Sequence, residues 1–363
     1  MKKLFLSLSL ALSVLCLNAQ DKPQYDIVTY RAGTLLGTIH IELFPLIAPL
    51  HVQNFDTLVS QSFYDSTAFH RVIPGFVIQG GDPNSRSGPK STWGFGQPGQ
   101  PTVNAEFNAV SHRRGILSAA RSSNINSATS QFFICHAAAT NLDWQYSAYG
   151  RVLTGIEIVD SIVFSPRDGN DCPLQKIEMF VTRTGYQDTI PEAPTGFVPM
   201  DGATGVAQST RFQWDPAFDA ILYEYELSTD SGFSTIISQG LSNDTSFVYN
   251  VLQPLTTYYW KVRTNNGGYN STWSATHSFQ TGLPGPTLVS PGNGSSGVNI
   301  PVTLLWNGLS GADSYHLQVA RSSSFSTPSI VLDVDSINDT TYVAANLNPN
   351  TNYFWRVRGR TGA

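Results

Sequence analysis

One arginine and two glutamines stand among aromatic and aliphatic residues in the first half of the sequence. Arg71 and Gln79 lie eight residues apart in an otherwise apolar run, and Gln131 precedes a second such run. Burying a guanidinium without a partner costs free energy, so Arg71 must either pair with an acid or face a ligand. The acids nearest to it in sequence are Asp65 and Asp82. Apolar walls with a few convergent polar groups are typical of a site for a small molecule or a peptide.

Other signatures of chemistry are missing or fail on their context. Residues 94–99 and 292–297 both fit GxGxxG, but neither stands between a strand and a helix as a dinucleotide site requires. The sequence has no GxSxG, HExxH or Walker motif. Beyond Cys16 it has only Cys135 and Cys172, too few for a structural zinc site, and whether these two pair stays open. We therefore expect neither a metal nor a cofactor.

The composition favours strands and turns around these residues. The 363 residues are 41% hydrophobic and only 13% charged, against about 25% charged in an average soluble protein. The 30 glycines and 21 prolines suit short strands joined by turns. A formal net charge of -5 argues against binding to nucleic acid or anionic membranes. The sequence predicts a mainly β protein of several domains.

The first residues have the pattern of a secretory signal peptide. Lys2 and Lys3 precede an apolar run over residues 4–17, and the small residue Ala19 ends the segment. We expect residues 1–19 to be cleaved after Ala19, with lipid modification of Cys16 as the alternative. The protein is then exported to the periplasm, the cell surface or the medium. No later stretch is apolar for long enough to predict a membrane span.

Residues 25–186 mix strands with two helical stretches. Segments 27–30 and 38–44 are rich in β-branched residues and flank a turn, which predicts a hairpin. Apolar residues from 48 to 59 are spaced by three and four, which predicts a helix, and a shorter one is expected over 155–162. The stretch from 80 to 101 is rich in Gly, Ser and Pro and is expected to be a loop.

A proline-containing linker over 187–194 is followed by a repeat of domain size. Three aromatic residues recur 92 residues later, and a Leu-x-Pro-x-Thr-x-Tyr motif recurs 95 residues later. The aromatics are Trp214, Tyr223 and Phe233, then Trp306, Tyr315 and Phe325; the motifs begin at Leu252 and Leu347. This period matches a β-sandwich of about 90–100 residues with a core Trp and a tyrosine corner, used twice.

The two repeats resemble fibronectin type III domains, over 195–282 and 283–363. The second stops soon after its shared motif, so we expect it to be truncated and the sequence to be part of a longer protein. Such modules often serve as spacers, and the fold alone assigns them no ligand. Trp273 and Tyr269 are candidate platforms for a glycan or protein ligand, with packing inside the domain as the alternative.

The segment over 25–186 resembles the cyclophilins, which are peptidyl-prolyl cis–trans isomerases. The likeness rests on motifs that follow one another along the sequence: Glu42 to Pro45, Asn54-Phe55, Phe63 to Asp65, Phe69 to Asp82, Gly115 to Arg121, Ser130 to Ile134 and Tyr149 to Val152. It implies an eight-stranded antiparallel barrel with two helices and an active site on the outer face of the barrel. Two immunoglobulin-like sandwiches would follow it.

The resemblance also implies roles for single residues. Arg71 stands at the position of the catalytic arginine, and His70 is expected to be structural support. The wall that receives the substrate proline would be formed by Phe76, Val77, Phe133 and Leu142, with Tyr146 closing the pocket. The substrate backbone would be held by Gln79, Ala120, Arg121 and Gln131. Asn141 replaces the aromatic residue associated with strong cyclosporin binding, so we expect weak binding of this drug.

These expectations combine into one function and two alternatives. We expect a peptidyl-prolyl cis–trans isomerase that acts on X–Pro bonds of exported polypeptides and assists their folding. The first alternative is a scaffold that binds proline peptides without turnover, although a scaffold would not need Arg71 among apolar residues. The second is an adhesive surface protein that uses its sandwich domains.

Overall fold

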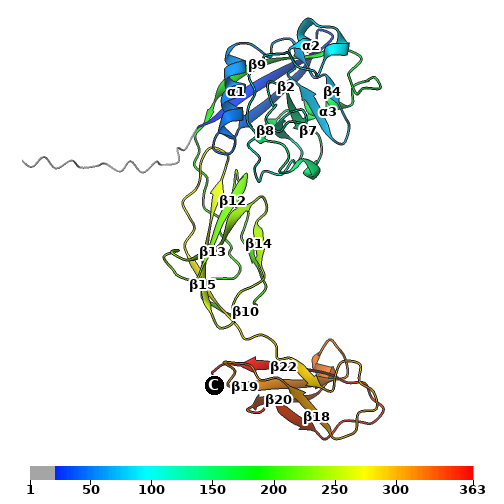
Figure 1. Cartoon of the computed structure of the whole chain (residues 1–363), viewed down its shortest axis with the longest axis vertical. Helices are drawn as coiled ribbons and strands as arrows, with labels where there is room; N and C mark the ends of the chain where they lie inside the picture. Colours follow the sequence, from blue (N-terminus) through cyan, green and yellow to red (C-terminus); the bar gives the residue numbers. More distant parts are fainter. Residues whose placement is uncertain (1–20, 363) are drawn as a thin grey trace, which may run out of the picture.

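The computed structural model describes residues 21–362, which form a barrel followed by two β-sandwiches (Figure 1). The predicted signal peptide over 1–19, with Cys16, lies outside the described residues. No helix in the described part is both long and apolar enough to cross a membrane. Both remaining cysteines, Cys135 and Cys172, are buried free thiols.

One sheet of nine strands forms the barrel, in the order β3-β9-β1-β2-β8-β6-β7-β5-β4. Its strands are β1 (Lys22–Arg31), β2 (Thr34–Leu43), β3 (Thr67–Ala68), β4 (Arg71–Val72), β5 (Val77–Gly80), β6 (Ile116–Ala119), β7 (Phe132–Cys135), β8 (Ala148–Thr154) and β9 (Ile177–Gln187). A bridge between Ala68 and Asp82 joins β3, at one end of the sheet, to the segment that follows β5, near the other end. The count exceeds the eight expected because β3 and β4 are separate strands of two residues each.

The two predicted helices are α1 (Pro49–Ser60) and α3 (Ile156–Val163). Pro49 starts α1, where its missing N–H and fixed φ suit the first turn. The Glu106 carboxylate accepts hydrogen bonds from the Leu50 and His51 amides, at 3.0 Å each, and so caps this helix end. The predicted loop over 80–101 is not entirely irregular, since it contains α2 (Asn84–Ser87) and a 3-10 turn, η1 (Lys90–Thr92). Another 3-10 turn is η2 (Thr140–Leu142).

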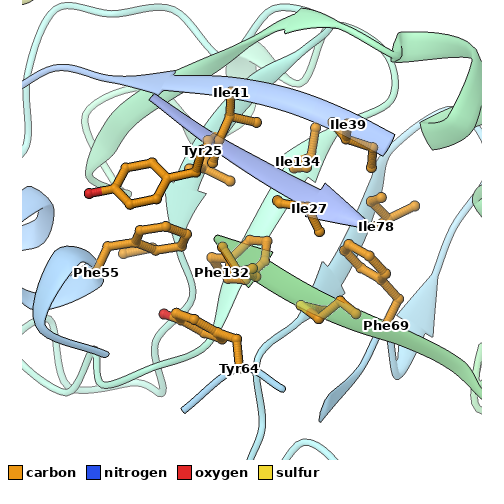
Figure 2. Close-up of a cluster of buried hydrophobic side chains, with 14 of the residues drawn as sticks. Tyr25, Ile27, Ile39, Ile41, Phe55, Tyr64, Phe69, Ile78, Phe132 and Ile134 are labelled. Carbon is orange, nitrogen blue, oxygen red and sulfur yellow. The ribbon is translucent and has the colours of Figure 1, made fainter. Parts of the chain in front are cut away.

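The barrel interior is filled by the inward residues of its strands (Figure 2). Ile27, Ile39, Ile78 and Ile134 are fully buried there. From α1, Phe55 adds its ring, which meets the Tyr25 ring edge-on at a centroid distance of 5.1 Å. Successive side chains of a strand point to opposite faces, so the residues directly before and after each of these isoleucines face outward.

The remaining strands form two pairs of sheets. The first sandwich contains β10 (Ala203–Val206), β11 (Thr210–Gln213), β12 (Leu222–Ser228), β13 (Ile236–Ser242), β14 (Ser246–Tyr249), β15 (Thr257–Asn265) and β16 (His277–Thr281). The second contains β17 (Leu288–Ser290), β18 (Val302–Trp306), β19 (Ser314–Ala320), β20 (Ile330–Ile337), β21 (Thr341–Ala344) and β22 (Phe354–Arg360), with a 3-10 turn, η3 (Thr327–Ser329). Each pairs two sheets, as the fold prediction requires.

The sequence repeat is visible in matching hydrogen bonds. The Tyr258 hydroxyl accepts from the Gln253 amide at 2.8 Å, and the Tyr353 hydroxyl accepts from the Asn348 amide at 2.9 Å. These are the two predicted tyrosine corners. Trp214 and Trp306 are buried at matching places, which confirms the prediction of a core tryptophan in each copy.

Candidate active site

The hairpin between β4 and β5 decides where Arg71 points. Pro74 and Gly75 form its turn, with Gly75 at φ +77°, which a residue with a side chain adopts only with strain. This turn sets Arg71 directly opposite Gln79, and the next strand sets Phe133 opposite Gln79. Directly paired residues share a face of a sheet, so these three side chains form a row on the outside of the barrel.

The next row in the same strands faces the other way. Val72, Ile78, Ile134 and Leu117 are paired across β4, β5, β7 and β6, and all four belong to the buried barrel core. The outward position of Arg71 is therefore fixed by the same alternation that fills the barrel. The cyclophilin resemblance implies a site on the outer face, and the register places Arg71, Gln79 and Phe133 on that face.

Arg71 is the cation that the site leaves available. Its side chain is partly exposed, and among residues 21–362 no ion pair or side-chain hydrogen bond holds its guanidinium. Arg151 shows the opposite arrangement, because its guanidinium is paired with both Glu42 and Asp219. Within residues 21–362, neither Asp65 nor Asp82 forms an ion pair with Arg71. The Asp82 carboxylate instead accepts a hydrogen bond from the Asn84 amide at 3.0 Å.

A small apolar cluster on the outer face includes Phe133, which lies in the same cross-strand row as Gln79 and Arg71. It consists of Val77, Ala120, Phe133, Cys135, Ala139 and Leu142, with Phe76 and Tyr146 packed against it. All five residues expected to receive the proline ring or close its pocket thus contact one cluster, and it is separate from the barrel core. The Tyr146 ring meets the Phe133 ring edge-on at a centroid distance of 5.6 Å.

The two glutamines are joined to each other and to the neighbouring loop. Gln79 Nε2 donates to Gln131 Oε1 at 3.1 Å, and Gln131 Nε2 donates to the Gly94 carbonyl at 3.0 Å. Their side chains are therefore fixed next to Arg71, where each amide still has a free donor or acceptor position for a substrate backbone.

Arg121 holds the segment that carries Leu142 and Tyr146. Its Nε and Nη2 donate to the Gln145 carbonyl at 3.1 and 2.9 Å, and its guanidinium carbon lies 4.6 Å from the centre of the Tyr146 ring. The Arg121 side chain therefore holds Gln145 and Tyr146 in place at the edge of the pocket. Contact of Ala120 and Arg121 with the substrate backbone stays a prediction.

Comparison with known proteins decides the family. The family model for cyclophilin-type peptidyl-prolyl cis–trans isomerases matches residues 27–184. The peptidyl-prolyl cis–trans isomerase of Acinetobacter baylyi is 41% identical over 138 residues, which are 37% of this chain and 70% of that protein. The chain belongs to the cyclophilin-type peptidyl-prolyl cis–trans isomerases.

Further relatives cover the same part. Peptidyl-prolyl cis–trans isomerase-like 3 of Dictyostelium discoideum is 39% identical over 147 residues, 40% of this chain and 87% of that protein. A solved cyclophilin of Cryptosporidium parvum, in the presence of the dipeptide Ala-Pro, has 29% identity and a TM-score of 0.39, covering 45% of this chain and 99% of that one. A second family model, the Rha78A-like N-terminal immunoglobulin domain, matches residues 219–285, which contain β12 to β16.

A hydrogen-bond network beneath the proline wall of this cyclophilin domain was not predicted from the sequence. His112 is buried and stacks on Phe133, with 5.9 Å between the ring centres. Its Nδ1 lies 2.9 Å from Asp143 Oδ1, and its Nε2 lies 3.1 Å from Ser118 Oγ. The order resembles a Ser–His–Asp triad, but Ser118 has no exposed surface, so no carbonyl carbon can reach its hydroxyl. The network therefore positions Phe133 and the η2 turn rather than attacking a substrate.

Burial favours the neutral forms of three titratable groups around the site, His70, His112 and Cys135. Burial lowers the pKa of His70 and of His112 below the ordinary histidine value, although nearby carboxylates oppose the shift. His70 is only 6% exposed, and its role as structural support stays a prediction. Burial also raises the pKa of the Cys135 thiol to about 12, so it carries no nucleophilic thiolate at neutral pH.

The candidate glycan platforms of the first sandwich are occupied by other groups. Trp273 lies beside Lys261 and Arg263, whose charged groups are 4.7 and 4.6 Å from a ring centre. The Tyr269 hydroxyl donates to Asp21. Both aromatic side chains are half-buried, so no observation favours a glycan site on them.

The neutral histidines predict how stability depends on pH. The pKa values of His70 and His112 are lower in the folded chain than their ordinary value near 6.5, so the unfolded chain binds more protons at acidic pH and the free energy of unfolding should fall as pH drops below 6.5. Urea unfolding of wild type and His70→Asn between pH 7.5 and 5.0 measures this. The variant should lose less stability over this range than wild type. A wild-type free energy of unfolding that stays constant or increases toward pH 5.0 would contradict the prediction.

Proposed function

We propose that this chain catalyses cis–trans isomerisation of X–Pro bonds in exported polypeptides and thereby assists their folding. One observation carries the proposal: an unpaired, partly exposed guanidinium on Arg71 adjoins an apolar cluster and two glutamines on one face of a rigid sheet. That is the arrangement a proline peptide requires. The ring can enter the cluster, the amides can hold the backbone, and the cation can reach the imide.

The peptide bond itself explains why a cation helps. Conjugation makes rotation cost ~18–20 kcal/mol, and an uncatalysed X–Pro bond isomerises over tens to hundreds of seconds. In the twisted transition state conjugation is lost, and the prolyl nitrogen regains a lone pair. A hydrogen-bond donor directed at this nitrogen binds the twisted form better than either planar form, and this difference in binding accelerates the reaction.

Arg71 is suited to this task because it stays charged and presents a rigid set of donors. Its freedom from ion pairs matters, since a carboxylate on the guanidinium would compete with the weakly basic nitrogen. The cluster around Phe133 fixes the proline ring while the chain on the other side of the bond turns. The reaction breaks no covalent bond, and the proposed mechanism assigns no role to a nucleophile.

Replacing Arg71 tests the catalytic claim. If Arg71 acts as one preorganised electrostatic donor, Arg71→Ala and Arg71→Lys should each cost about 2.7–4 kcal/mol, or roughly 10²–10³ in kcat/KM. A protease-coupled prolyl assay on the chain from Gln20 to Ala363 measures this. Arg211→Ala is the matched control, because Arg211 contacts Ser246 in the first sandwich and should keep the wild-type rate. Equal rates for wild type and Arg71→Ala would leave only a proline-peptide binder.

Weak cyclosporin binding is proposed from one position. Asn141 is exposed on η2, next to the buried Leu142 of the proline wall, so an aromatic residue there could cover a ligand in the pocket. Asn141→Trp should increase cyclosporin affinity at least tenfold, about 1.4 kcal/mol. Isothermal titration calorimetry on both proteins checks this. Unchanged affinity in the variant would show that Asn141 does not limit binding.

Export is proposed from the segment over residues 1–19. The described fold fits removal of this segment, because β1 begins at Lys22, soon after the expected cleavage point. Expression of the full sequence in a bacterium, followed by fractionation and N-terminal sequencing, should give an exported chain starting at Gln20. A chain that starts at Met1 and stays in the cytoplasm would refute export, whereas a lipid-modified Cys16 would place the protein on a membrane surface.

A further inference from the structure

The first sandwich contacts the barrel through a buried cluster of four charged groups. Lys22 and Arg151 of the barrel share the carboxylates of Glu42, also from the barrel, and of Asp219, from the sandwich. Lys22 Nζ lies 3.2 Å from Glu42 and 2.8 Å from Asp219, and its side chain is only 1% exposed. The barrel alone would leave two cations with one carboxylate. Asp219 brings this cluster to neutrality, which a buried group of charges requires.

Asp219 is held in place for this contact. Its backbone is in the left-handed region, at φ +61°, which Asp tolerates better than most residues. Asn266 Nδ2 donates to Asp219 Oδ2 at 3.1 Å and to the Thr189 carbonyl at 2.9 Å. Although burial opposes the ionised form, Lys22 and Arg151 hold the pKa of Asp219 below its ordinary value.

Apolar and backbone contacts extend the same interface. Phe44, Ala109, Val110 and Ala148 of the barrel form one buried cluster with Leu222 of the sandwich. The Leu46 amide donates to the Gly267 carbonyl at 2.8 Å. Gly267 is at φ +92°, and a Cβ there would lie 2.5 Å from the Phe44 ring. The two surfaces thus fit at atomic contact, unlike those of domains joined only by a linker.

The barrel segment in this interface also supports the proline wall. Asn243 Nδ2 of the sandwich donates to the Ala109 carbonyl at 3.3 Å, and Asp244 pairs with Arg113 at 2.9 Å. Between these contacts, Ser111 Oγ donates to Asp143 at 2.7 Å, and His112 stacks on Phe133. Segment 109–113 therefore lies between the sandwich and the residues that shape the proline pocket.

We propose that the first sandwich is a fixed part of the isomerase, and that Asp219 is a positioning residue which locks it against segment 109–113 and so shapes the proline pocket. Its effect on turnover rests on the function proposed above, whereas its effect on docking and peptide binding does not. Arg71 lies on β4, at the end of the sheet away from β8 and β6, so the effect falls on the apolar wall rather than on the catalytic cation.

Charge removal with rescue tests the proposal in the chain from Gln20 to Ala363. Asp219→Asn leaves the cluster with an unbalanced cation, and Lys22→Met in the same chain restores balance through the remaining Arg151–Glu42 pair. The readouts are calorimetric unfolding, the affinity for a blocked Ala-Ala-Pro-Phe peptide, and KM and kcat in the prolyl assay. Asp335→Asn is the matched control, because it removes an ion pair with Arg360 inside the second sandwich.

We expect wild type to unfold its barrel and first sandwich in one transition. Asp219→Asn should split this transition and weaken peptide binding at least threefold, raising KM more than it lowers kcat. The double variant should regain most of both properties, and Asp335→Asn should change neither. Gly267→Ala, which inserts a methyl group against Phe44, should act like Asp219→Asn through a different contact.

Two results would overturn the proposal. One is an Asp219→Asn protein with the wild-type transition and peptide affinity; the other is a defect that Lys22→Met does not relieve. If Arg71→Ala turned over substrate as fast as wild type while Asp219→Asn still split the transition and weakened binding, catalysis by Arg71 would fail and the positioning role would stand.

Discussion

The functional face of this protein depends on the register of four short antiparallel strands. The same pairing that buries Val72 and Ile78 in the barrel turns Arg71 and Gln79 outward. A slip of one residue would exchange the two sets and place a guanidinium in the core. Register is strongly specified here, because the cost of burying the cation adds to the loss of the apolar contacts. The register of these strands therefore determines both the barrel core and the candidate site.

The treatment of charge separates structural from functional cations. Lys22 is buried and Arg151 is partly exposed, and each is paired with two carboxylates, whereas Arg71 is partly exposed without one. A cation without a carboxylate partner is tolerated only where water or a ligand solvates it, because burying an unpaired charge costs free energy. The neighbouring glutamines are neutral, so they fix a substrate backbone without competing for the guanidinium. This difference supports the catalytic role proposed for Arg71.

Local patterns were sufficient for much of the fold and for the visible part of the site. The spacing of apolar residues from 48 to 59 predicted α1, and the repeated tyrosine motifs predicted two sandwiches with matching corners. The residues around Arg71 left open whether it pairs with an acid or faces a ligand, and the outer-face site beside an apolar wall followed from the resemblance to the cyclophilins. Each of these features depends on neighbours in the same strand, helix or turn. The ninth strand was not predicted, because β3 and β4 have only two residues each and strands this short show no periodicity.

Contacts between residues far apart in the sequence produce no periodic pattern from which they could be predicted. His112 stands 31 residues before Asp143, and Lys22 stands 197 residues before Asp219, so no window of sequence contains either pair. Composition placed a boundary between the barrel and the first sandwich, where the residues become almost purely strand and turn. Composition does not report whether two neighbouring folds share a surface. The clue that sequence reading could have weighed is Lys22, a lysine that opens a strand of alternating apolar residues and must therefore find a carboxylate when that strand is buried. One carboxylate partner of Lys22, Glu42, lies on the neighbouring strand of the hairpin, and the other, Asp219, belongs to the next domain.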